Sequence, residues 1–379
     1  MADFPILQFG TSRFLQAHAD LFVSEALKRN EALGPIAVVQ TTNSAENRGR
    51  LAFFASGKPY AVQIRGLANG EVVETRVEVD SIRHGVHAND DWPQVERLFC
   101  EAECVISNTG DRGYELDPAD RADSAPPRSF PAKLAKLLLA RRRSGAPPPT
   151  LIPCELVVSN GAVLRDTVLR VLAGWGAPDA ARRWVAEDCV WANSLVDRIV
   201  SEPLEPAGAV AEPYALWAIE DRPGLVAPCR HPDIVVTKDL RPYLRLKLFI
   251  LNLGHTFLAE LWSAKGLSSA MMVREAMADP ALRPALDSLY AEEVLPVFAG
   301  IGMGEEARAY RDSVIERFSN PFLNHRLAEI FNDHEAKKAH RFAGLIALAE
   351  THGLGASLPR IRAALSSNQG ASLSSTAAG

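Results

Sequence analysis

Neither acidic nor basic residues dominate this sequence, and it has few cysteines and no long uninterrupted apolar run. Its 41 Lys and Arg residues and 46 Asp and Glu residues are interspersed, and the net charge is only -5. A nucleic-acid-binding protein usually carries a basic excess on one face. We therefore expect no nucleic-acid partner.

The five cysteines are too few and too scattered for a disulfide framework or a zinc site. They stand at positions 100, 104, 154, 189 and 229 without C-x-x-C spacing. Reduced thiols of this kind are typical of the cytoplasm. The first residues also lack the basic segment and apolar run of a signal peptide, so we expect a cytoplasmic protein.

The longest apolar stretch, residues 243–262, does not have the composition of a membrane span. It contains Arg245, Lys247, Asn252, His255 and Glu260, and such groups are costly in a bilayer. We expect a buried helix here and no membrane partner.

What the chain does contain is typical of a globular protein. Hydrophobic residues make up 47% of its 379 residues, with 25 Gly and 25 Pro, enough for a large core and two domains. Residues 366–379 are Ser, Ala, Gly, Asn and Gln around a lone Leu373, with one threonine. They predict a disordered tail.

Short apolar runs alternate with helical periodicity through residues 1–200. Runs at 5–9 and 36–40 flank a helical pattern at 13–28, which predicts a βαβ unit. Alternating residues at 60–79 around Asn69-Gly70 predict a hairpin. Strands are then expected at 104–107 and 150–158, and helices at 95–102, 131–143 and 163–175. The fold class predicted is an α/β domain with a doubly wound parallel sheet.

The second half has a different pattern. Pro and Gly interrupt residues 203–232, and helical periodicity dominates from 241 to 365. We therefore expect a mainly α-helical C-terminal domain over residues 201–365, after an N-terminal domain over residues 1–200.

The first strand-to-helix turn has features of a nucleotide-binding loop. Gly10 permits a tight turn, and Thr11 and Ser12 are small enough for backbone N–H groups to approach a pyrophosphate. The G-x-G-x-x-G pattern is broken, however, because Ser12 and Leu15 occupy the later glycine positions. A plain turn with a Ser cap is the alternative interpretation.

The sequence does not settle whether the cofactor's adenosine ribose carries a 2′-phosphate. Residues 40–43 read QTTN and lack the acidic residue that usually binds the adenosine ribose of NAD. Arg48 and Arg50 follow and could meet a 2′-phosphate. NAD is the cofactor we expect, and NADP stays open.

Lys247, Asn252 and His255 form the most informative pattern in the chain. At about 100° per residue, Asn252 lies about 140° and His255 about 80° around a helix from Lys247, so the three share one broad side. Their neighbours are apolar, and an unpaired polar group there costs about 1–3 kcal/mol. A structural role, with Lys247 reaching the surface and His255 satisfied in the core, is one explanation.

The other explanation is a site that oxidises an alcohol without a metal. A desolvated lysine can accept a hydroxyl proton near neutral pH while hydride leaves for a nicotinamide. Asn252 and His255 could donate hydrogen bonds to the developing alkoxide. A separate group, His84 and His87 with Asp90 and Asp91, has the right donors for a metal but is more typical of a solvated loop.

The sequence resembles the polyol-specific long-chain dehydrogenases, the family of mannitol dehydrogenase, mannitol-1-phosphate dehydrogenase and the hexuronate reductases. The resemblance rests on K-x4-N-x2-H at 247–255, GTSRFLQAH at 10–18, SNT at 107–109, PCEL with NG at 153–161, NSLVDRI at 193–199 and RFSNP at 317–321. These blocks stand in the family's order. Ser12 and Gln16 depart from the family's opening motif.

The resemblance implies a Rossmann-like domain followed by a helical domain, an NAD-dependent enzyme acting on CH–OH groups, and residue roles. Lys247 would be the general acid/base, and Asn252 and His255 would position and polarise the reacting oxygen. The substrate would contact Asn160, Asp197, Arg198 and Arg317. The cofactor would contact Gly10, Thr11, Ser12, Arg13, Phe14, Thr41, Asn108 and Thr109.

Within this family, residues 154–156 and 212–220 look most like the tagaturonate reductases, also called altronate oxidoreductases. The implied substrate is a hexuronate, with Arg317, Lys337 or Lys338 as the cation for its carboxylate. The chain length is nearer that of the sugar-phosphate members, so mannitol 1-phosphate or another polyol is an alternative substrate. A non-catalytic, dinucleotide-binding regulatory protein is an alternative of another class. We expect a monomer or a weak homo-oligomer.

Overall fold

The protein consists of two compact units. The computed structural model describes residues 2–42, 45–110 and 112–367. The first unit comprises the described residues of Met1–Arg65 and Val72–Arg241, and the second those of Gly66–Glu71 and Pro242–Gly379. A short segment near residue 70 thus belongs with the C-terminal part of the chain.

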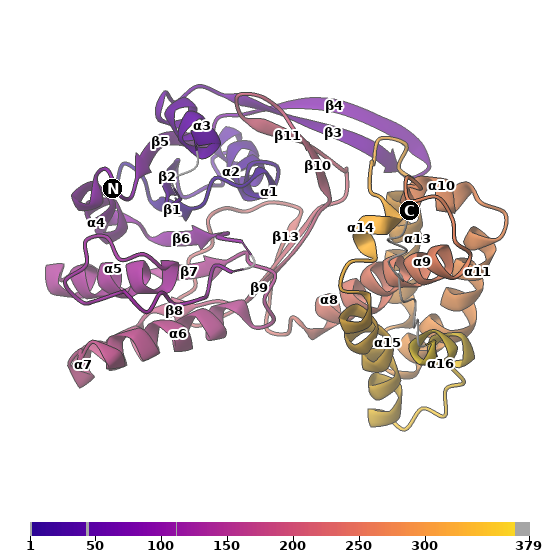
Figure 1. Ribbon diagram of the computed structural model, residues 1–379. Helices are drawn as coiled ribbons and strands as arrows, with labels where there is room; N and C mark the ends of the chain where they lie inside the picture. The colour runs from indigo at the N-terminus through magenta and orange to yellow at the C-terminus, as the bar shows by residue number, and fades with distance from the viewer. Residues whose placement is uncertain (1, 43–44, 111, 368–379) are drawn as a thin grey trace, which may run out of the picture. The chain divides into compact units, whose positions relative to one another are not determined.

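A six-stranded parallel sheet forms the centre of the first unit (Figure 1). Its strands are β1 (Ile6–Phe9), β2 (Ile36–Gln40), β5 (Ile82–His87), β6 (Cys104–Ser107), β7 (Thr150–Pro153) and β8 (Val190–Trp191). Their order is β5-β2-β1-β6-β7-β8, and every neighbouring pair is parallel. The direction of winding therefore reverses between β1 and β6, which confirms the predicted doubly wound fold.

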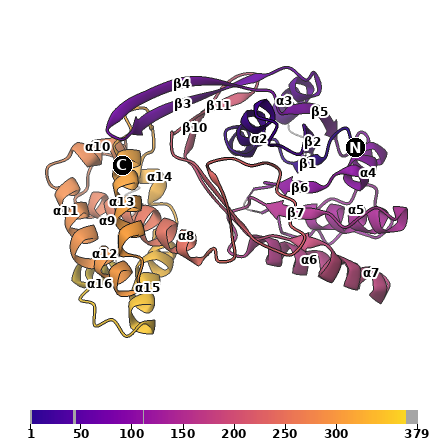
Figure 2. The same ribbon diagram turned by 180° about the vertical axis from the view of Figure 1, so that it is seen from behind.

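Helices cover both faces of this sheet (Figures 1 and 2). They are α2 (Ala19–Lys28), α3 (Ala45–Ala55), α4 (Trp92–Glu101), α5 (Phe130–Ser144) and α6 (Asn160–Gly174). Ile6 and Val38 pack in one core cluster with α2 and α3, whereas Leu7 and Val39 pack in a second with α4, α5 and α6. Successive strand residues point to opposite faces, which is why these strands are apolar throughout.

The helix expected at 13–28 is broken near its start. It forms α1 (Arg13–Gln16) and α2, separated at His18, whose backbone angles (φ -132°, ψ -95°) are not helical. The His18 ring stacks on Phe14 at 4.7 Å, and its Nε2 lies 3.1 Å from the carbonyl oxygen of Leu216. These tertiary contacts override the local helical pattern.

The predicted hairpin is present as β3 (Tyr60–Ala68) and β4 (Glu71–Val79). Asn69 (φ 54°) and Gly70 (φ 79°) both have positive φ, as a two-residue hairpin turn of type I′ requires. β3 belongs to a four-stranded sheet of order β10-β11-β3-β4, with β10 (Val200–Pro203) and β11 (Gly208–Ala211).

The first unit extends beyond residue 200, where its end was expected. β11 pairs with β3, and β12 (Leu216–Glu220) pairs with β9 (Ser194–Asp197) and β13 (Ile234–Thr237), so the Pro- and Gly-rich segment contributes strands to this unit. The strand expected at 150–158 is shorter, since β7 ends at Pro153. α7 (Asp179–Arg183) and a π-helical turn (Trp184–Asp188) precede β8.

The second unit is helical, as predicted. Its helices are α8 (Arg241–Leu246), η2 (Lys247–Asn252), α9 (Leu253–Ala264), α10 (Val273–Ala278), α11 (Leu282–Leu289), η3 (Tyr290–Val294), α12 (Leu295–Gly300), α13 (Gly304–Phe318), α14 (Leu327–Ile330), α15 (His334–Thr351) and α16 (Pro359–Ser366). The elements η2 and η3 are π-helical. In the described part of the chain, no helix has the length and hydropathy needed to cross a membrane.

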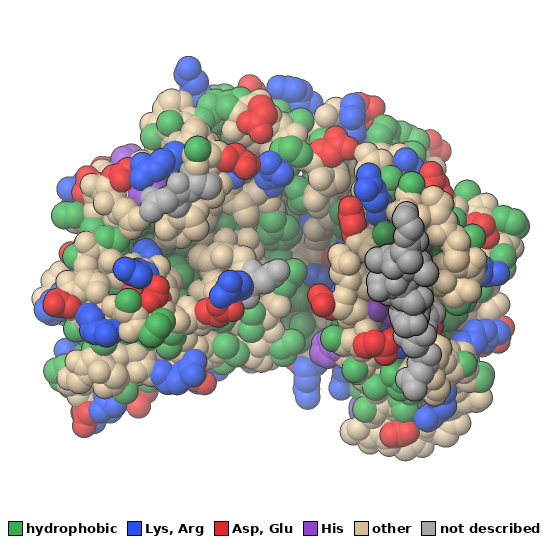
Figure 3. Space-filling view, in the orientation of Figure 1, with side chains coloured by type: hydrophobic (Ala, Val, Ile, Leu, Met, Phe, Trp, Pro, Cys, Tyr) green, Lys and Arg blue, Asp and Glu red, His purple; other side chains and the backbone are tan. Residues whose placement is uncertain are grey.

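The start of the expected tail is ordered. Ser366 ends α16, and the Ser367 hydroxyl donates a hydrogen bond to Glu260. Residues 368–379 lie outside the described residues. On the face drawn in Figure 3, acidic and basic side chains are interspersed over each unit, as the sequence indicated.

Candidate functional site

The turn after β1 lies at the position where the sheet reverses its winding. Gly10 has φ 112°, and a Cβ there would come within 2.5 Å of the Asn108 carbonyl oxygen. The two loops that follow β1 and β6 therefore touch at this point, and only glycine fits. Ligands of doubly wound sheets bind at such a switch point, beyond the carboxyl ends of the strands.

The backbone of this turn has N–H groups available for an anion. Ser12 caps α1, its Oγ accepting from the Leu15 N–H at 3.2 Å. The N–H groups of Thr11, Ser12, Arg13 and Phe14 make no hydrogen bond with another described residue, as expected in the first turn of a helix. These donors suit a pyrophosphate, although α1 is only one turn long.

A buried carboxylate holds the loop after β6. Glu155 accepts hydrogen bonds at 3.0 Å from the Ser107 hydroxyl, the Thr109 backbone N–H and the Thr109 hydroxyl, and at 3.2 Å from the Tyr114 hydroxyl. The Asn108 side-chain amide donates to the Cys154 carbonyl at 2.9 Å. Glu155 was part of a motif in the sequence, but its role as the organiser of this loop was not predicted.

The segment after β2 contains Thr41, and Asn43 lies outside the described residues. Both arginines considered for a 2′-phosphate pair with carboxylates of the same unit. Arg48 makes a bidentate pair with Asp90 at 2.7 and 3.1 Å, which lowers the pKa of that carboxyl. Arg50 binds Glu46 at 2.6 Å and the Thr11 carbonyl at 3.1 Å.

Two predicted substrate residues are held by backbone groups. The Asn160 amide nitrogen donates to the carbonyls of Pro153, Glu155 and Ser194, and its oxygen accepts from two backbone N–H groups. Arg198 donates to the carbonyls of Glu212 and Ala17, and burial lowers its pKa to about 10. Both join neighbouring loops, and contact with a substrate stays a prediction for each.

Asp197, the third residue predicted in this region, is the last residue of β9. Its side chain is buried, with 3% of its surface exposed. Its role toward a substrate also stays a prediction.

Lys247, Asn252 and His255 lie on one continuous helical run in the second unit. Lys247 begins η2 and Asn252 ends it, while His255 lies in the first turn of α9. The Leu253 N–H bonds to the Leu248 carbonyl five residues earlier. A π-turn holds more residues than an α-turn, so residues five apart come closer to alignment than the sequence estimate assumed.

A tyrosine and a glycine accompany this π-helical segment. The Tyr290 hydroxyl donates to the Ile250 carbonyl at 2.9 Å. A Cβ on Gly254 would lie 1.9 Å from that same hydroxyl oxygen. Glycine at 254 therefore lets Tyr290 reach the carbonyl of the π-turn, and π-turns are frequent at functional sites.

His255 is buried and neutral. Its ring stacks on Phe318 at 4.1 Å, and its Nε2 has no hydrogen-bond partner among the described residues. Burial lowers the pKa of this imidazole well below its ordinary value of 6.5, and the positive charges of His325, Arg341, Arg317 and Lys337 lower it further. A neutral ring with a free nitrogen is suited to hydrogen-bond a substrate oxygen.

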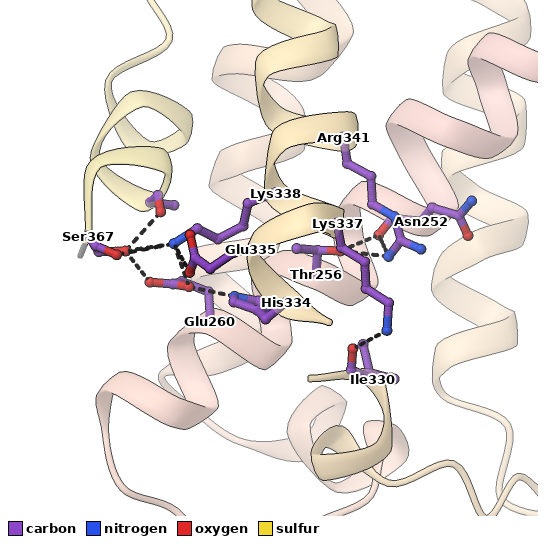
Figure 4. Close-up of polar contacts among 11 residues, drawn as sticks. Asn252, Thr256, Glu260, Ile330, His334, Glu335, Lys337, Lys338, Arg341 and Ser367 are labelled. Carbon is purple, nitrogen blue, oxygen red and sulfur yellow. Dashed lines mark hydrogen bonds and ion pairs between the residues drawn. The ribbon is translucent and has the colours of Figure 1, made fainter. Parts of the chain in front are cut away.

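The three cations considered for a substrate carboxylate have different surroundings. Arg317 is buried, and its Nη1 lies 3.4 Å from the Tyr310 hydroxyl. Lys338 is fully buried and paired with Glu335 at 3.0 Å and Glu260 at 3.7 Å, so it is occupied (Figure 4). Lys337 donates to the Ile330 carbonyl at 2.8 Å.

Arg341 is a further cation that sequence reasoning missed. Its Nη1 donates to the Asn252 carbonyl at 3.0 Å and to the Thr256 hydroxyl at 2.6 Å (Figure 4). It is 89 residues from Asn252 in sequence. The only available signal was the pair of cations at 337 and 341, which share a helix face.

The two histidines considered as metal ligands lie in β5 rather than in the solvated loop expected from the sequence, and His87 is buried. His87 Nε2 lies 3.1 Å from the Thr42 carbonyl, and Asp90 pairs with Arg48. Among the described residues, no cluster of three or more His, Cys, Asp or Glu side chains is arranged to hold a metal ion.

The fold and these side chains define a class of protein. A parallel sheet with a glycine turn at its switch point, in a chain that also carries Lys, Asn and a neutral His on one helical run, is typical of dinucleotide-dependent dehydrogenases.

The chain belongs to the mannitol dehydrogenase family. Residues 5–227 match the model of the mannitol dehydrogenase Rossmann domain, and residues 239–360 match that of the mannitol dehydrogenase C-terminal domain. The membership predicted from short motifs is therefore confirmed. The predicted class, an NAD-dependent enzyme acting on CH–OH groups, is confirmed at the level of the family.

Curated relatives cover most of the chain. An altronate oxidoreductase of Bacillus subtilis (strain 168) is 32% identical over 351 residues, which are 86% of this chain and 71% of that protein. An altronate oxidoreductase of Klebsiella pneumoniae (strain 342) is 31% identical over 350 residues, with the same coverage of each chain.

Solved structures share the fold. D-sorbitol dehydrogenase in substrate-free form superposes with a TM-score of 0.79 at 21% identity, covering 95% of this chain and 79% of that one. Pseudomonas fluorescens mannitol 2-dehydrogenase, in a ternary complex with NAD and D-mannitol, gives 0.74 at 21% identity, covering 96% and 78%.

Proposed function

We propose that this protein is an NAD-dependent oxidoreductase that interconverts the hydroxyl of altronate and the ketone of tagaturonate. The observation that carries the proposal is the likeness to altronate oxidoreductases, at 31–32% identity over 86% of the chain. The placement of Lys247, Asn252 and His255 on one helical run supports the same reaction class. We also propose a cytoplasmic location, in keeping with five free cysteines.

The residues of the first unit fit a dinucleotide. The N–H groups at Thr11, Ser12, Arg13 and Phe14 would meet its pyrophosphate. Thr41 would lie beside the adenosine ribose, and the loop with Asn108 and Thr109 beside the nicotinamide. When bound, NAD accepts the hydride that leaves the alcohol carbon. NAD is the cofactor proposed. NADP stays an alternative, because the carboxylates paired with Arg48 and Arg50 are solvent-exposed and such pairs are weak.

Lys247 acts as the general base in oxidation and as the general acid in reduction. The amine takes the hydroxyl proton as the C–O bond gains double-bond character, and it returns that proton in the reverse direction. Asn252 and the neutral His255 donate hydrogen bonds to the reacting oxygen. This proton transfer requires no metal ion.

The proposal is tested by following NADH absorbance with purified protein. We expect sustained oxidation of NADH with tagaturonate, and slower oxidation with fructuronate, fructose 6-phosphate and fructose. Preference for a sugar phosphate would assign the chain to that branch of the family. NADH binding without turnover of any of these compounds would favour a regulatory protein instead.

A further inference from the structure

One face of α15 carries two cations toward the helical run that holds Asn252. Lys337 and Arg341 are four residues apart, and Figure 4 shows both on the side of α15 that faces Asn252, Thr256 and Ile330. Lys338 points the other way, toward Glu260 and Ser367. Two like charges four residues apart destabilise a helix, so the presence of both cations on one face of α15 calls for an explanation.

The Arg341 guanidinium is partly buried without a carboxylate partner. Its two hydrogen bonds run from Nη1 to neutral oxygens, those of Asn252 and Thr256. Its Nε and Nη2 have no partner among the described residues. Burial lowers the pKa of this arginine to about 10, with no acidic group acting in the opposite direction. A half-buried arginine normally has an anion beside it.

The surroundings of His255 are electropositive as well. Arg341, Arg317 and Lys337 act on the imidazole with positive charge. His325 lies beside it as well, but burial lowers the pKa of that second imidazole and favours its neutral form. Two carboxylates act on the outer members of this group: Glu329 on His325, and Asp333 on Lys337. Neither is paired with Arg341 in the described structure. The charges around His255 therefore favour a negatively charged ligand.

We infer that Arg341, assisted by Lys337, forms a carboxylate subsite that gives the enzyme its preference for acidic sugars. This inference rests on the proposed function and names the part of the substrate recognised. Asn252 and Thr256 hold Nη1 and so fix the plane of the guanidinium. The Nε–Nη2 edge is left to make two parallel hydrogen bonds to a carboxylate.

This assignment adds Arg341 to the cations considered from the sequence, keeps Lys337 and leaves out Lys338, while the role of Arg317 stays a prediction. Lys338 is neutralised by Glu260 and Glu335. Arg341, by contrast, bonds directly to the backbone of Asn252, a predicted catalytic residue. A carboxylate at Arg341 would thus be placed at a fixed distance from the residues that bind the reacting oxygen, and a neutral polyol would lack this contact.

The test compares wild type, Arg341→Met and Arg341→Lys with tagaturonate and with tagatose, its neutral counterpart. For Arg341→Met we expect kcat/KM for tagaturonate to fall about 10- to 100-fold more than kcat/KM for tagatose, because only tagaturonate loses a charge-assisted hydrogen-bond pair. Arg341→Lys keeps the charge without the fork and should be intermediate. Arg362→Met, an exposed arginine paired with Glu350, is the matched control and should behave as wild type.

The ratio of kcat/KM for tagaturonate to kcat/KM for tagatose distinguishes a loss of specificity from misfolding, because a damaged fold lowers both values together. An unchanged ratio in Arg341→Met overturns the subsite and leaves the proposed function intact. Fructose 6-phosphate reduced better than tagaturonate by wild type would assign a phosphate ligand and also overturn the carboxylate assignment. If wild type reduces no hexuronate, the proposed function fails.

Calorimetric titration with altronate tests the subsite independently of turnover. We expect the Kd to rise about 10-fold or more in Arg341→Met. Equal affinity in wild type and variant overturns the inference.

Discussion

Lys247 is the side chain on which the proposed proton transfer depends. Replacing it with Ala removes the acid/base, so we expect kcat to fall about 10²- to 10⁴-fold. NADH binding, which the first unit provides, should be nearly unchanged. Stopped-flow turnover and NADH fluorescence titration measure the two effects. Lys265→Ala, at an exposed position, serves as control. A Lys247→Ala variant that kept wild-type turnover, or that lost NADH binding, would contradict the assignment.

Asp20 makes stability depend on pH. It is fully buried in α2, accepts a hydrogen bond from Tyr60 at 3.1 Å, and burial raises its pKa to about 7. The folded state therefore retains this proton longer than the unfolded chain. As the pH rises from about 4 to about 7, the unfolded chain releases the proton first, and the free energy of unfolding falls by at most about 4 kcal/mol.

Asp20→Asn should abolish that contribution. We expect the variant to gain thermal stability relative to wild type at pH 8 and to gain none at pH 4. Melting curves at both pH values measure this difference. Asp166→Asn, an exposed change in α6, should show no such pH dependence. If Asp20→Asn changed the melting temperature equally at both pH values, Asp20 would be ionised in the folded protein.

Gly254 supports the π-helical segment that carries Lys247 and Asn252. A methyl group at this position would overlap the Tyr290 hydroxyl, which bonds to the Ile250 carbonyl. We expect Gly254→Ala to lower the free energy of unfolding by about 1–3 kcal/mol and to lower kcat as the helix shifts. Denaturant unfolding and turnover measure both effects.

Gly174→Ala provides the matched control for that change. Gly174 ends α6, and a methyl group added there would have no neighbouring atom within 4 Å. This substitution should be neutral or slightly stabilising. If Gly254→Ala were equally harmless, the contact with Tyr290 would not be what maintains the π-turn.

The helices and strands differ in how far the sequence alone predicts them. The apolar runs of β1, β2 and β6 were predictable because strands buried on both faces are apolar at every position. The break at His18 and the π-turn at 247–252 were not, because each depends on a contact from a distant element: the Leu216 carbonyl and the Tyr290 hydroxyl.

The candidate site divides in the same way. Lys247, Asn252 and His255 could be found because they lie within nine residues on one helical run. Arg341 could not be assigned, since only the fold brings it to Asn252. The sequence suggests Arg48 as a phosphate ligand, whereas in the fold Arg48 pairs with Asp90. Local periodicity places residues on a helix face, but it does not identify their partners.

The tip of the β3–β4 hairpin joins the second unit through Glu316. Its carboxylate accepts from the Gly70 N–H at 2.7 Å. We expect Glu316→Ala to lower the free energy of unfolding by about 0.5–1.5 kcal/mol and to accelerate hydrogen exchange of the Gly70 amide. Exchange measured by mass spectrometry resolves this peptide. Glu350→Ala, which removes an exposed ion pair, is the control, and unchanged exchange at Gly70 would rule out this role for Glu316.

Gly66–Glu71 is grouped with the second unit although it is encoded within the first. The polypeptide accordingly passes from one unit to the other three times. If the gene were divided after Arg241, the N-terminal fragment would contain six residues that belong structurally to the second unit. Attempts to exchange catalytic halves among related enzymes would have to transplant that loop together with the C-terminal portion.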